Sequence, residues 1–395
     1  MDEPPESSFA SWSPAGPVAG WLDAPPGGLG GGASGAGGEA DERHAPLRES
    51  WLRTVFRFTR ADGSPVFGPR GKRDARLAEL ARWVRRLDDR QLDRVLGWWR
   101  PARSADEGGW TSPPLPTAGW LDRPLAVMRP DWMARGDCVA VDHRGDGGSS
   151  LIEVAGRGAT WLGPGWSSPS LDGPIGPARA TYWSTGSSAD AFEWSFRAGA
   201  VDVTRTAILI RGGHLALLMQ AELGAGPGVG EVRWDLPDGV DARPDPARRA
   251  LILSAGRGRA AARLVPIGLP DAPYATERGG LEVDGRAVVL RQRTEGPNRC
   301  LALLACWRKE PPRDWRVLTV AENSAACPPG TAFAARVGWG VKQTSLLVYR
   351  SLGPAGLRSV LGHQTRARLV VGAFTPTGDV RPWIKATDDE PPARG

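Results

Sequence analysis

The chain has 395 residues, of which 41% are hydrophobic and 24% are charged, close to the usage of ordinary globular proteins. This length accommodates two to three average domains, or one small element and a large all-β unit. No apolar stretch approaches the roughly 18 to 20 residues that a membrane-spanning helix needs. We therefore exclude an integral membrane protein and expect a soluble chain without membrane insertion.

The net charge is +6 and the isoelectric point is about 9.5, values that allow an acidic partner. Only four of the 50 basic residues are lysine, and arginine accompanies abundant Gly, Ala and Pro. This usage is typical of a GC-rich genome, so compositional bias with a solvated surface competes with a basic binding face. No phosphate loop or RNA-binding aromatic signature is present, and we predict no nucleic-acid partner.

The cysteines form no CxxC pair and no metal-ligand spacing; they are Cys138, Cys300, Cys306 and Cys327. We predict no disulfide framework, no metal site and no cofactor. The first residues contain no basic region followed by an apolar segment, so no secretory signal is visible. Cytoplasmic localisation is the default expectation.

Three segments have the composition of tails and linkers. Residues 1–46 are rich in Gly, Pro, Ser and Ala and offer little to bury, which predicts a disordered tail. Residues 101–120 are interrupted by several prolines and are predicted to be a linker. Residues 389–395 form a short C-terminal tail in this prediction.

Residues 47–100 have a helical apolar period. Leu77, Leu80 and Val84 recur on one face of the helix that this period predicts. Asp88 and Asp89 precede a further apolar-periodic run and are expected to cap its helix. We predict a short helical segment that acts as a cap or docking arm.

Residues 121–388 alternate with period two and have tight turns between the apolar runs. Residues 200–211 are followed by Gly212–Gly213 and a second apolar run, and residues 281–290 contain Asp284–Gly285 between two runs. Both patterns predict β-hairpins. Many short strands without intervening helices predict a mainly β fold, a large two-sheet antiparallel β-sandwich preceded by the helical segment.

Two stretches of this β region resemble a known family. Residues 126–132, Ala-Val-Met-Arg-Pro-Asp-Trp, and residues 149–165, which end in Gly-Pro-Gly, are similar to the C-terminal β-domain of heparinase II/III-like polysaccharide lyases. The resemblance covers residues 120–240 and extends to 388 by continuity of pattern. It implies a β-supersandwich and β-elimination of uronate-containing polysaccharides in a cleft formed with a helical toroid.

The sequence departs from the family at its functional motifs. The family's His-x-His-x-Asp stretch falls on His143–Gly147, where Gly145 and Gly147 replace the second His and the Asp. An expected His–Asn pair falls on Ser188–Ala189, and only a few helices precede the sandwich. We therefore predict a degenerate relative that lacks most of the toroid.

Four residues are the catalytic candidates if the chain is a lyase. Tyr182 or His143 would remove the proton α to a uronate carboxylate. Arg179 or Arg205 would neutralise that carboxylate. Each has a structural alternative, because Tyr182 suits cross-strand packing and His143 lies in a turn between aspartates.

The carbohydrate-binding candidates are Trp161, Trp166, Trp183 and His363. Flat indoles suit pyranose rings, and Trp161 and Trp166 flank the Gly163–Gly165 turn. Most of the 18 tryptophans must fill the core, because an indole buries a large apolar area. His363 lies in a polar turn between strand-like segments, where binding residues concentrate.

The sequence is compatible with three functions, and it does not indicate the oligomeric state. The favoured interpretation is a non-catalytic protein that binds an acidic or neutral polysaccharide. The alternatives are an active polysaccharide lyase and an interaction scaffold without sugar affinity. A lyase requires a base and an arginine at one sugar, whereas a scaffold requires an exposed apolar patch.

Overall fold

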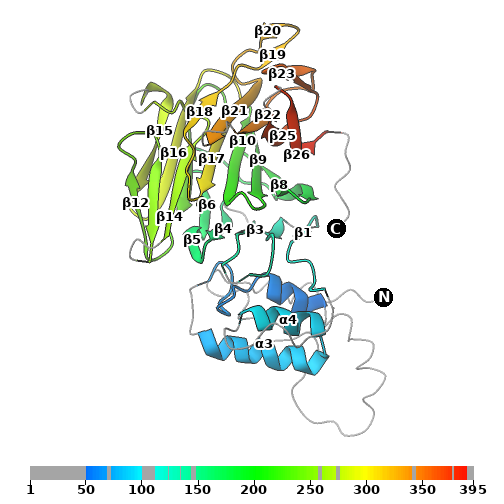
Figure 1. The fold of residues 1–395 in the computed structure, drawn as a ribbon. Helices are drawn as coiled ribbons and strands as arrows, with labels where there is room; N and C mark the ends of the chain where they lie inside the picture. Colours follow the sequence, from blue (N-terminus) through cyan, green and yellow to red (C-terminus); the bar gives the residue numbers. More distant parts are fainter. Residues whose placement is uncertain are drawn as a thin grey trace. The chain divides into compact units, whose positions relative to one another are not determined.

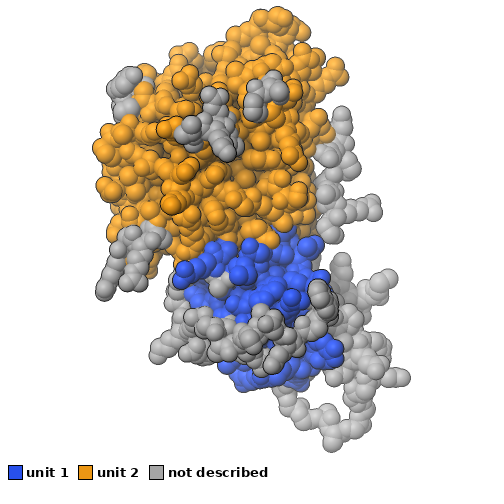
Figure 2. All heavy atoms as spheres, in the orientation of Figure 1, with its two compact units in different colours: residues 1–118, 131–136 blue, residues 119–130, 137–395 orange. Residues whose placement is uncertain are grey.

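The computed structural model describes residues 50–68, 73–99, 112–122, 124–133, 135–143, 148–256, 260–272, 276–339, 344–375 and 378–388. The two predicted tails and residues 101–111 of the predicted linker lie outside these ranges. The chain divides into two compact units, residues 1–118 with 131–136 and residues 119–130 with 137–395, which Figure 2 shows in different colours.

The first unit is helical, as the apolar period predicts. Its helices span residues 50–57, α3 (Arg73–Leu87) and α4 (Arg90–Trp99). The Asp89 carboxylate caps α4, because its Oδ1 accepts the backbone amides of Gln91 and Leu92 at 3.0 Å each. The predicted helical segment and its cap are confirmed.

The first unit also includes residues that are distant in the sequence. The Trp99 ring stacks on Phe56 with centroids 5.5 Å apart, and its indole N–H donates to the Trp132 carbonyl at 2.7 Å. The Trp132 indole N–H in turn donates to the Pro114 carbonyl at 2.7 Å. These bonds explain why residues 131–136 belong to the helical unit although strands flank them in the sequence.

The second unit is mainly β, and its strands form four antiparallel sheets in the described part of the chain (Figure 1). The strands of the first sheet are β1 (Ala118–Trp120), β2 (Leu125–Met128), β3 (Cys138–Asp142), β4 (Ser150–Gly156), β5 (Ala159–Leu162), β6 (Gly165–Ser167), β11 (Gly228–Asp235), β15 (Gly279–Asp284) and β16 (Ala287–Thr294). Their order is β1-β2-β3-β4-β6-β11-β16-β15, and β5 pairs with β4. A short 3-10 helix, η2 (Thr276–Arg278), precedes β15.

The second sheet is the central one. Its strands are β7 (Arg179–Thr185), β8 (Ala189–Ala198), β9 (Val201–Ile210), β10 (Leu215–Leu223), β12 (Val240–Pro244), β13 (Leu251–Ala255), β14 (Ala260–Pro266) and β17 (Arg299–Cys306). Their order is β12-β13-β14-β17-β10-β9-β8-β7. The predicted hairpins are present as β9–β10 in this sheet and β15–β16 in the first, with antiparallel registers.

The third and fourth sheets come from the C-terminal part of the chain. The third has the order β18-β21-β22-β25-β26 and the fourth β20-β19-β23-β24. Their strands are β18 (Asp314–Val317), β19 (Ala321–Glu322), β20 (Ala325–Ala326), β21 (Ala332–Trp339), β22 (Thr344–Ser351), β23 (Arg358–Val360), β24 (His363–Thr365), β25 (Leu369–Phe374) and β26 (Val380–Ala386).

The central sheet is buried on both faces. Along β9, Ala207 and Leu209 belong to a core shared with the first sheet, whereas Ile208 and Ile210 belong to a core shared with the third. A strand with two buried faces is apolar at nearly every position, as β17 is. The predicted antiparallel sandwich is therefore confirmed, and a third sheet covers the face that a two-sheet sandwich would leave in water.

Candidate functional site

The most polar part of the core between the first two sheets surrounds Arg205 of β9. Its side chain is fully buried, and its Nε donates to Gln220 Oε1 at 2.9 Å. Its Nη1 donates to the Ser150 hydroxyl at 2.8 Å and to the Trp166 carbonyl at 3.1 Å, and its Nη2 donates to the Ser168 hydroxyl at 2.9 Å. Every nitrogen of the guanidinium thus has a hydrogen-bond acceptor, which a buried cation requires.

Two aromatic rings also contact this guanidinium. It lies 5.1 Å from the centroids of both the Trp166 and the Phe196 rings, within cation–π range. Burial lowers the pKa of Arg205 to about 9, and the Glu222 carboxylate opposes that shift. A pKa near 9 leaves Arg205 protonated at neutral pH, so the core contains a permanent positive charge.

The countercharge is reached through a glutamine. Gln220 Nε2 donates to Glu222 Oε1 at 2.6 Å, and Arg299 Nε donates to Glu222 Oε2 at 2.5 Å. Glu222 is fully buried and Arg299 is 6% exposed. Arg299 therefore pairs with Glu222 directly, whereas Arg205 is linked to this carboxylate through Gln220.

His143 lies next to Arg205 at the end of β3. Its Nδ1 is 2.7 Å from the Ser150 hydroxyl oxygen, and its ring stacks on Phe196 with centroids 5.1 Å apart. Because Ser150 accepts a hydrogen bond from Arg205, its hydroxyl proton is free to donate to Nδ1. Burial and the charge of Arg205 lower the pKa of His143 to about 3. The ring is thus neutral at physiological pH and a weak proton acceptor.

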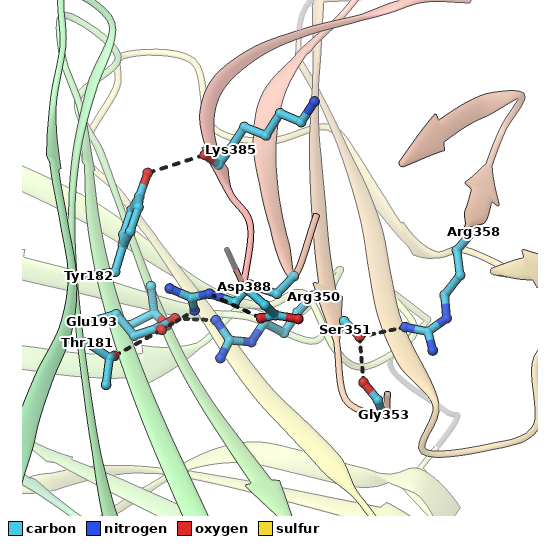
Figure 3. A network of polar contacts seen from close by, with 11 residues as sticks. Thr181, Tyr182, Glu193, Arg350, Ser351, Gly353, Arg358, Lys385 and Asp388 are labelled. Atoms are coloured by element: carbon cyan, nitrogen blue, oxygen red, sulfur yellow. Dashed lines mark hydrogen bonds and ion pairs between the residues drawn. The ribbon is translucent and has the colours of Figure 1, made fainter. Parts of the chain in front are cut away.

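A second polar network joins the central sheet to the third sheet (Figure 3). The carboxylate of Glu193, on β8, accepts hydrogen bonds from Arg350 and Thr206 at Oε2 and from Arg368 and Thr181 at Oε1. Burial by itself raises the pKa of Glu193, but the charges and hydrogen bonds of Arg350 and Arg368 outweigh it and hold that pKa below its ordinary value. The network is an ionic link between two layers of the sandwich.

Tyr182 borders this second network. Its side chain is buried, and its hydroxyl lies 3.5 Å from the Lys385 carbonyl oxygen. The Arg368 guanidinium lies 5.4 Å from the Tyr182 ring centroid, and its Nε is 3.8 Å from Asp388. Tyr182 therefore faces the third sheet, near Glu193 (Figure 3).

The four catalytic candidates do not converge. His143 and Arg205 are joined through Ser150 in the core between the first and second sheets. Tyr182 lies in the core on the opposite face of the second sheet, and Arg179 is exposed at the start of β7. Only His143 and Arg205 contact a common side chain.

A β-bulge explains the position of Tyr182. The register of β7 against β8 shifts between Ala180 and Tyr182, so Ala180 pairs with Trp194 and Tyr182 pairs with Glu193. Trp194 is also the cross-strand partner of Arg205 and shares its face. If β7 paired regularly through residue 181, Tyr182 would lie on the face of Trp194 and Arg205, because side chains two apart in a regular strand share a face.

The three candidate indoles are core residues. Trp161 and Trp166 are fully buried, and Trp183 is 5% exposed. Trp166 contacts the Trp194 and Trp234 rings, with centroids 5.4 and 5.8 Å away. The expectation that these indoles offer a ring face to a sugar is not met, because other side chains already fill the space beside them. Their large apolar area instead fills the wide gap between sheets.

His363 is half-buried on β24 of the fourth sheet. Burial and Lys385 lower its pKa, while Asp379 acts in the opposite direction. Within the described residues, no hydrogen bond joins His363 to either of the two buried networks.

The ion pairs of Glu193 with Arg350 and Arg368 were not predicted from the sequence. A signal for Glu193 exists, because it is an acidic residue inside the apolar run Ala-Asp-Ala-Phe-Glu-Trp-Ser-Phe of β8. A charge there predicts a buried partner. The partners follow Glu193 by 157 and 175 positions, and nothing local identifies them.

A smaller polar cluster lies at the β9–β10 turn. His214 Nδ1 is 3.0 Å from an oxygen of the buried Asp137 carboxylate, which also accepts the Trp307 indole N–H at 2.7 Å. Among the described residues, no group of three or more His, Cys, Asp and Glu side chains is arranged to hold a metal ion. None of the helices in that part of the chain is long and apolar enough to cross a membrane.

Solved structures with a similar architecture include a heparan sulfate lyase and heparinase III. The heparan sulfate lyase HepC from Pedobacter heparinus matches 79% of this chain with a TM-score of 0.56 and 12% identity, and heparinase III matches 79% with a TM-score of 0.55 and 9% identity. A heparinase III gene product matches 78% with a TM-score of 0.54. No family profile and no curated protein matches the sequence.

These similarities define the class of fold. The chain has the heparinase-like β-sandwich and is a distant structural relative of these proteins. It spans about half the length of each, between 53% and 55%.

Proposed function

We propose that this chain is a non-catalytic polysaccharide-binding protein built on a heparinase-like β-sandwich. The observation that supports it is the similarity of 79% of the chain to structures named for heparan sulfate cleavage and heparinase activity. A fold shared at 9 to 12% identity preserves architecture more readily than chemistry, so the proposal keeps the ligand class and leaves out the reaction.

The positions of the acid–base candidates support the non-catalytic half of the proposal. Tyr182 and His143 lie on opposite faces of the central sheet, so they do not meet at one sugar ring. The pKa of His143, about 3, makes it a poor base at neutral pH. Tyr182 is buried with its hydroxyl near a backbone carbonyl.

A second candidate function, polysaccharide lyase, is favoured by one observation. His143, Ser150 and Arg205 form a continuous hydrogen-bonded group, which brings together a possible base and a positive charge, the two roles that β-elimination of a uronate needs. In this version His143 takes the role of the base that Tyr182 could otherwise fill, Arg205 neutralises the carboxylate, and a helical toroid comes from another chain. The full burial of Arg205 opposes it, because the sugar must reach that side chain.

One experiment separates these functions. The full chain is applied to an array of acidic and neutral polysaccharides at low and high salt, and the same glycans are assayed for unsaturated uronate by ultraviolet absorbance. Retention without new absorbance supports the proposal, whereas absorbance that is lost in His143→Gln and kept in Tyr182→Phe supports the lyase. Absence of retention on every glycan refutes both and leaves an interaction scaffold.

A further inference from the structure

The segment that contains the helices, residues 51–100, has a high density of positive charge. Residues 51–100 contain 13 Lys or Arg against 6 Asp or Glu, a net charge of +7, whereas the whole chain has +6. Residues 1–50 have a net charge of −6, and the β unit has +6 spread over a much longer stretch of chain. A compositional bias toward arginine acts on the whole chain and does not by itself explain this local density, which favours attraction of a polyanion at residues 51–100.

Four arginines of this unit are exposed at the end of one helix and the start of the next. Arg82, Arg85 and Arg86 belong to α3, and Arg90 is the first residue of α4. No ion pair joins any of them to a carboxylate in the described part of the chain. We call these four residues the helical arginine surface.

This arrangement opposes helix stability. Arg82 precedes Arg85 and Arg86 by three and four positions, so like charges are neighbours on the surface of α3. Such pairs of like charges are destabilising in isolated helices. The helix dipole favours Arg85 and Arg86 in the last turn of α3, but it disfavours Arg90 at the start of α4. Helix stability therefore does not account for the whole surface.

Two guanidinium groups of this unit make cation–π contacts with neighbouring indoles. The Arg86 guanidinium lies 5.6 Å from the centroid of the half-exposed Trp83 ring, and Arg94 lies 5.5 Å from that of Trp98. The Arg86 guanidinium, stacked over the Trp83 ring, can bind an oxyanion through two parallel hydrogen bonds.

The same contacts indicate which polyanion fits. Arg86 and Arg94 already cover a face of Trp83 and Trp98, so stacking of a nucleic-acid base there would displace an arginine. The apolar residues of α4 are buried, and Leu77, Leu80 and Val84 of α3 are buried too, so these helices leave no broad apolar face for a lipid surface within the described residues. These two helices are therefore suited to bind oxyanions along a polymer, without base stacking and without lipid insertion.

We propose that the helical arginine surface binds an acidic polysaccharide through its carboxylate or sulfate groups. This inference rests on the proposed polysaccharide-binding function and moves the ligand from the β-sandwich to the helices. Arg86 and Arg90 are four residue steps apart, which span at most about 15 Å of chain, so one polysaccharide strand can contact both helices.

The test compares two variants with the same change in net charge. The first is Arg82→Gln, Arg85→Gln, Arg86→Gln and Arg90→Gln; the matched control is Arg243→Gln, Arg293→Gln, Arg313→Gln and Arg316→Gln, four exposed arginines of the β unit. Glutamine keeps the helix propensity of arginine, and circular dichroism checks that both variants fold. The full-length chains are titrated with dextran sulfate, carboxymethyl dextran, dextran and a single-stranded oligonucleotide.

We expect binding of the two charged dextrans and none of neutral dextran, with affinity that falls as salt rises. An exposed ion pair contributes a factor of about 1.4 to 5, so loss of four weakens binding at least about fourfold, while the control stays within about twofold. Equal weakening in both variants overturns the inference and leaves the proposed function intact. Tighter binding of the oligonucleotide, lost in the first variant, replaces the glycan by a nucleic acid. No binding of any glycan overturns both proposals.

Discussion

Replacement of Glu193 by glutamine tests whether the second polar network holds two sheets together. Glu193 is 1% exposed and is the shared carboxylate of Arg350, which is 8% exposed, and Arg368, which is 17% exposed. The glutamine side chain would keep the volume of the glutamate but lose its charge. Arg350 would then be left as a buried, unpaired cation, while Arg368 can turn toward solvent and Asp388.

The expected loss of stability is large. Breaking a buried ion pair by removing one partner costs about 3–5 kcal/mol, because the remaining charge stays desolvated. Two hydrogen bonds to charged donors at about 1.5–3 kcal/mol each give the same magnitude. We therefore expect Glu193→Gln to lower the free energy of unfolding by about 3–5 kcal/mol.

Urea-induced unfolding at pH 7, followed by tryptophan fluorescence, measures this loss. The matched control is Glu282→Gln, because Glu282 pairs with Arg291 but is 54% exposed and should cost less than about 1 kcal/mol. The double variant Glu193→Gln, Arg350→Met removes the stranded cation and should recover part of the loss. Equal stability of Glu193→Gln and Glu282→Gln would refute the role of the network.

The pH dependence provides an independent check on the same residue. The folded pKa of Glu193 lies below its ordinary value, so its contribution is fully present above the unfolded pKa of about 4.3 and is lost as pH falls through the folded pKa. Protonation then does what glutamine does. The difference in stability between the wild type and Glu193→Gln should therefore shrink below about pH 4.

Three further predictions concern buried groups. The pKa of His143 is about 3 in the folded chain and about 6.5 in the unfolded chain, so below about pH 6.5 the unfolded chain binds a proton that the folded chain excludes. The free energy of unfolding should therefore fall by about 1.4 kcal/mol for each pH unit as the pH is lowered from about 6.5 toward 3. In urea titrations, His143→Gln should lack this contribution to the slope. Burial raises the pKa of the Cys300 thiol to about 12, and only Cys327 is half-exposed, so a thiol reagent at pH 8 should modify one cysteine in the folded chain and four after denaturation. A Cβ added at Gly156 would lie 2.1 Å from a buried indole nitrogen, so Gly156→Ala should destabilise by about 1–3 kcal/mol or more, whereas Gly280→Ala, with nothing within 4 Å, should melt as the wild type does.

Local features of this fold could be predicted from the sequence because their causes are local. The helical period of Leu77, Leu80 and Val84, and the capping aspartate at Asp89, act within a few residues. The Gly212–Gly213 turn likewise specifies a hairpin between neighbouring strands. Alternation with period two identified the antiparallel sheets for the same reason.

The number of layers was not predictable in the same way. Continuous apolar strands such as β17 indicate burial on both faces, but they do not say which later segment covers the second face. Residues 314–386 supply the third and fourth sheets. The ionic link between Glu193 and Arg350 depends on that stacking, because the two residues are 157 positions apart.

The candidate site shows most clearly which features cannot be predicted from local sequence patterns. Apolar periodicity and turn residues are enough to place His143, Arg205 and Tyr182 in or beside antiparallel strands, because both signals are local. The stacking of the sheets places His143 and Arg205 in the core between the first and second sheets and Tyr182 in the core between the second and third. The reason is one extra residue in β7, between Ala180 and Tyr182, since a shift of one position exchanges the faces of a strand and leaves its composition unchanged.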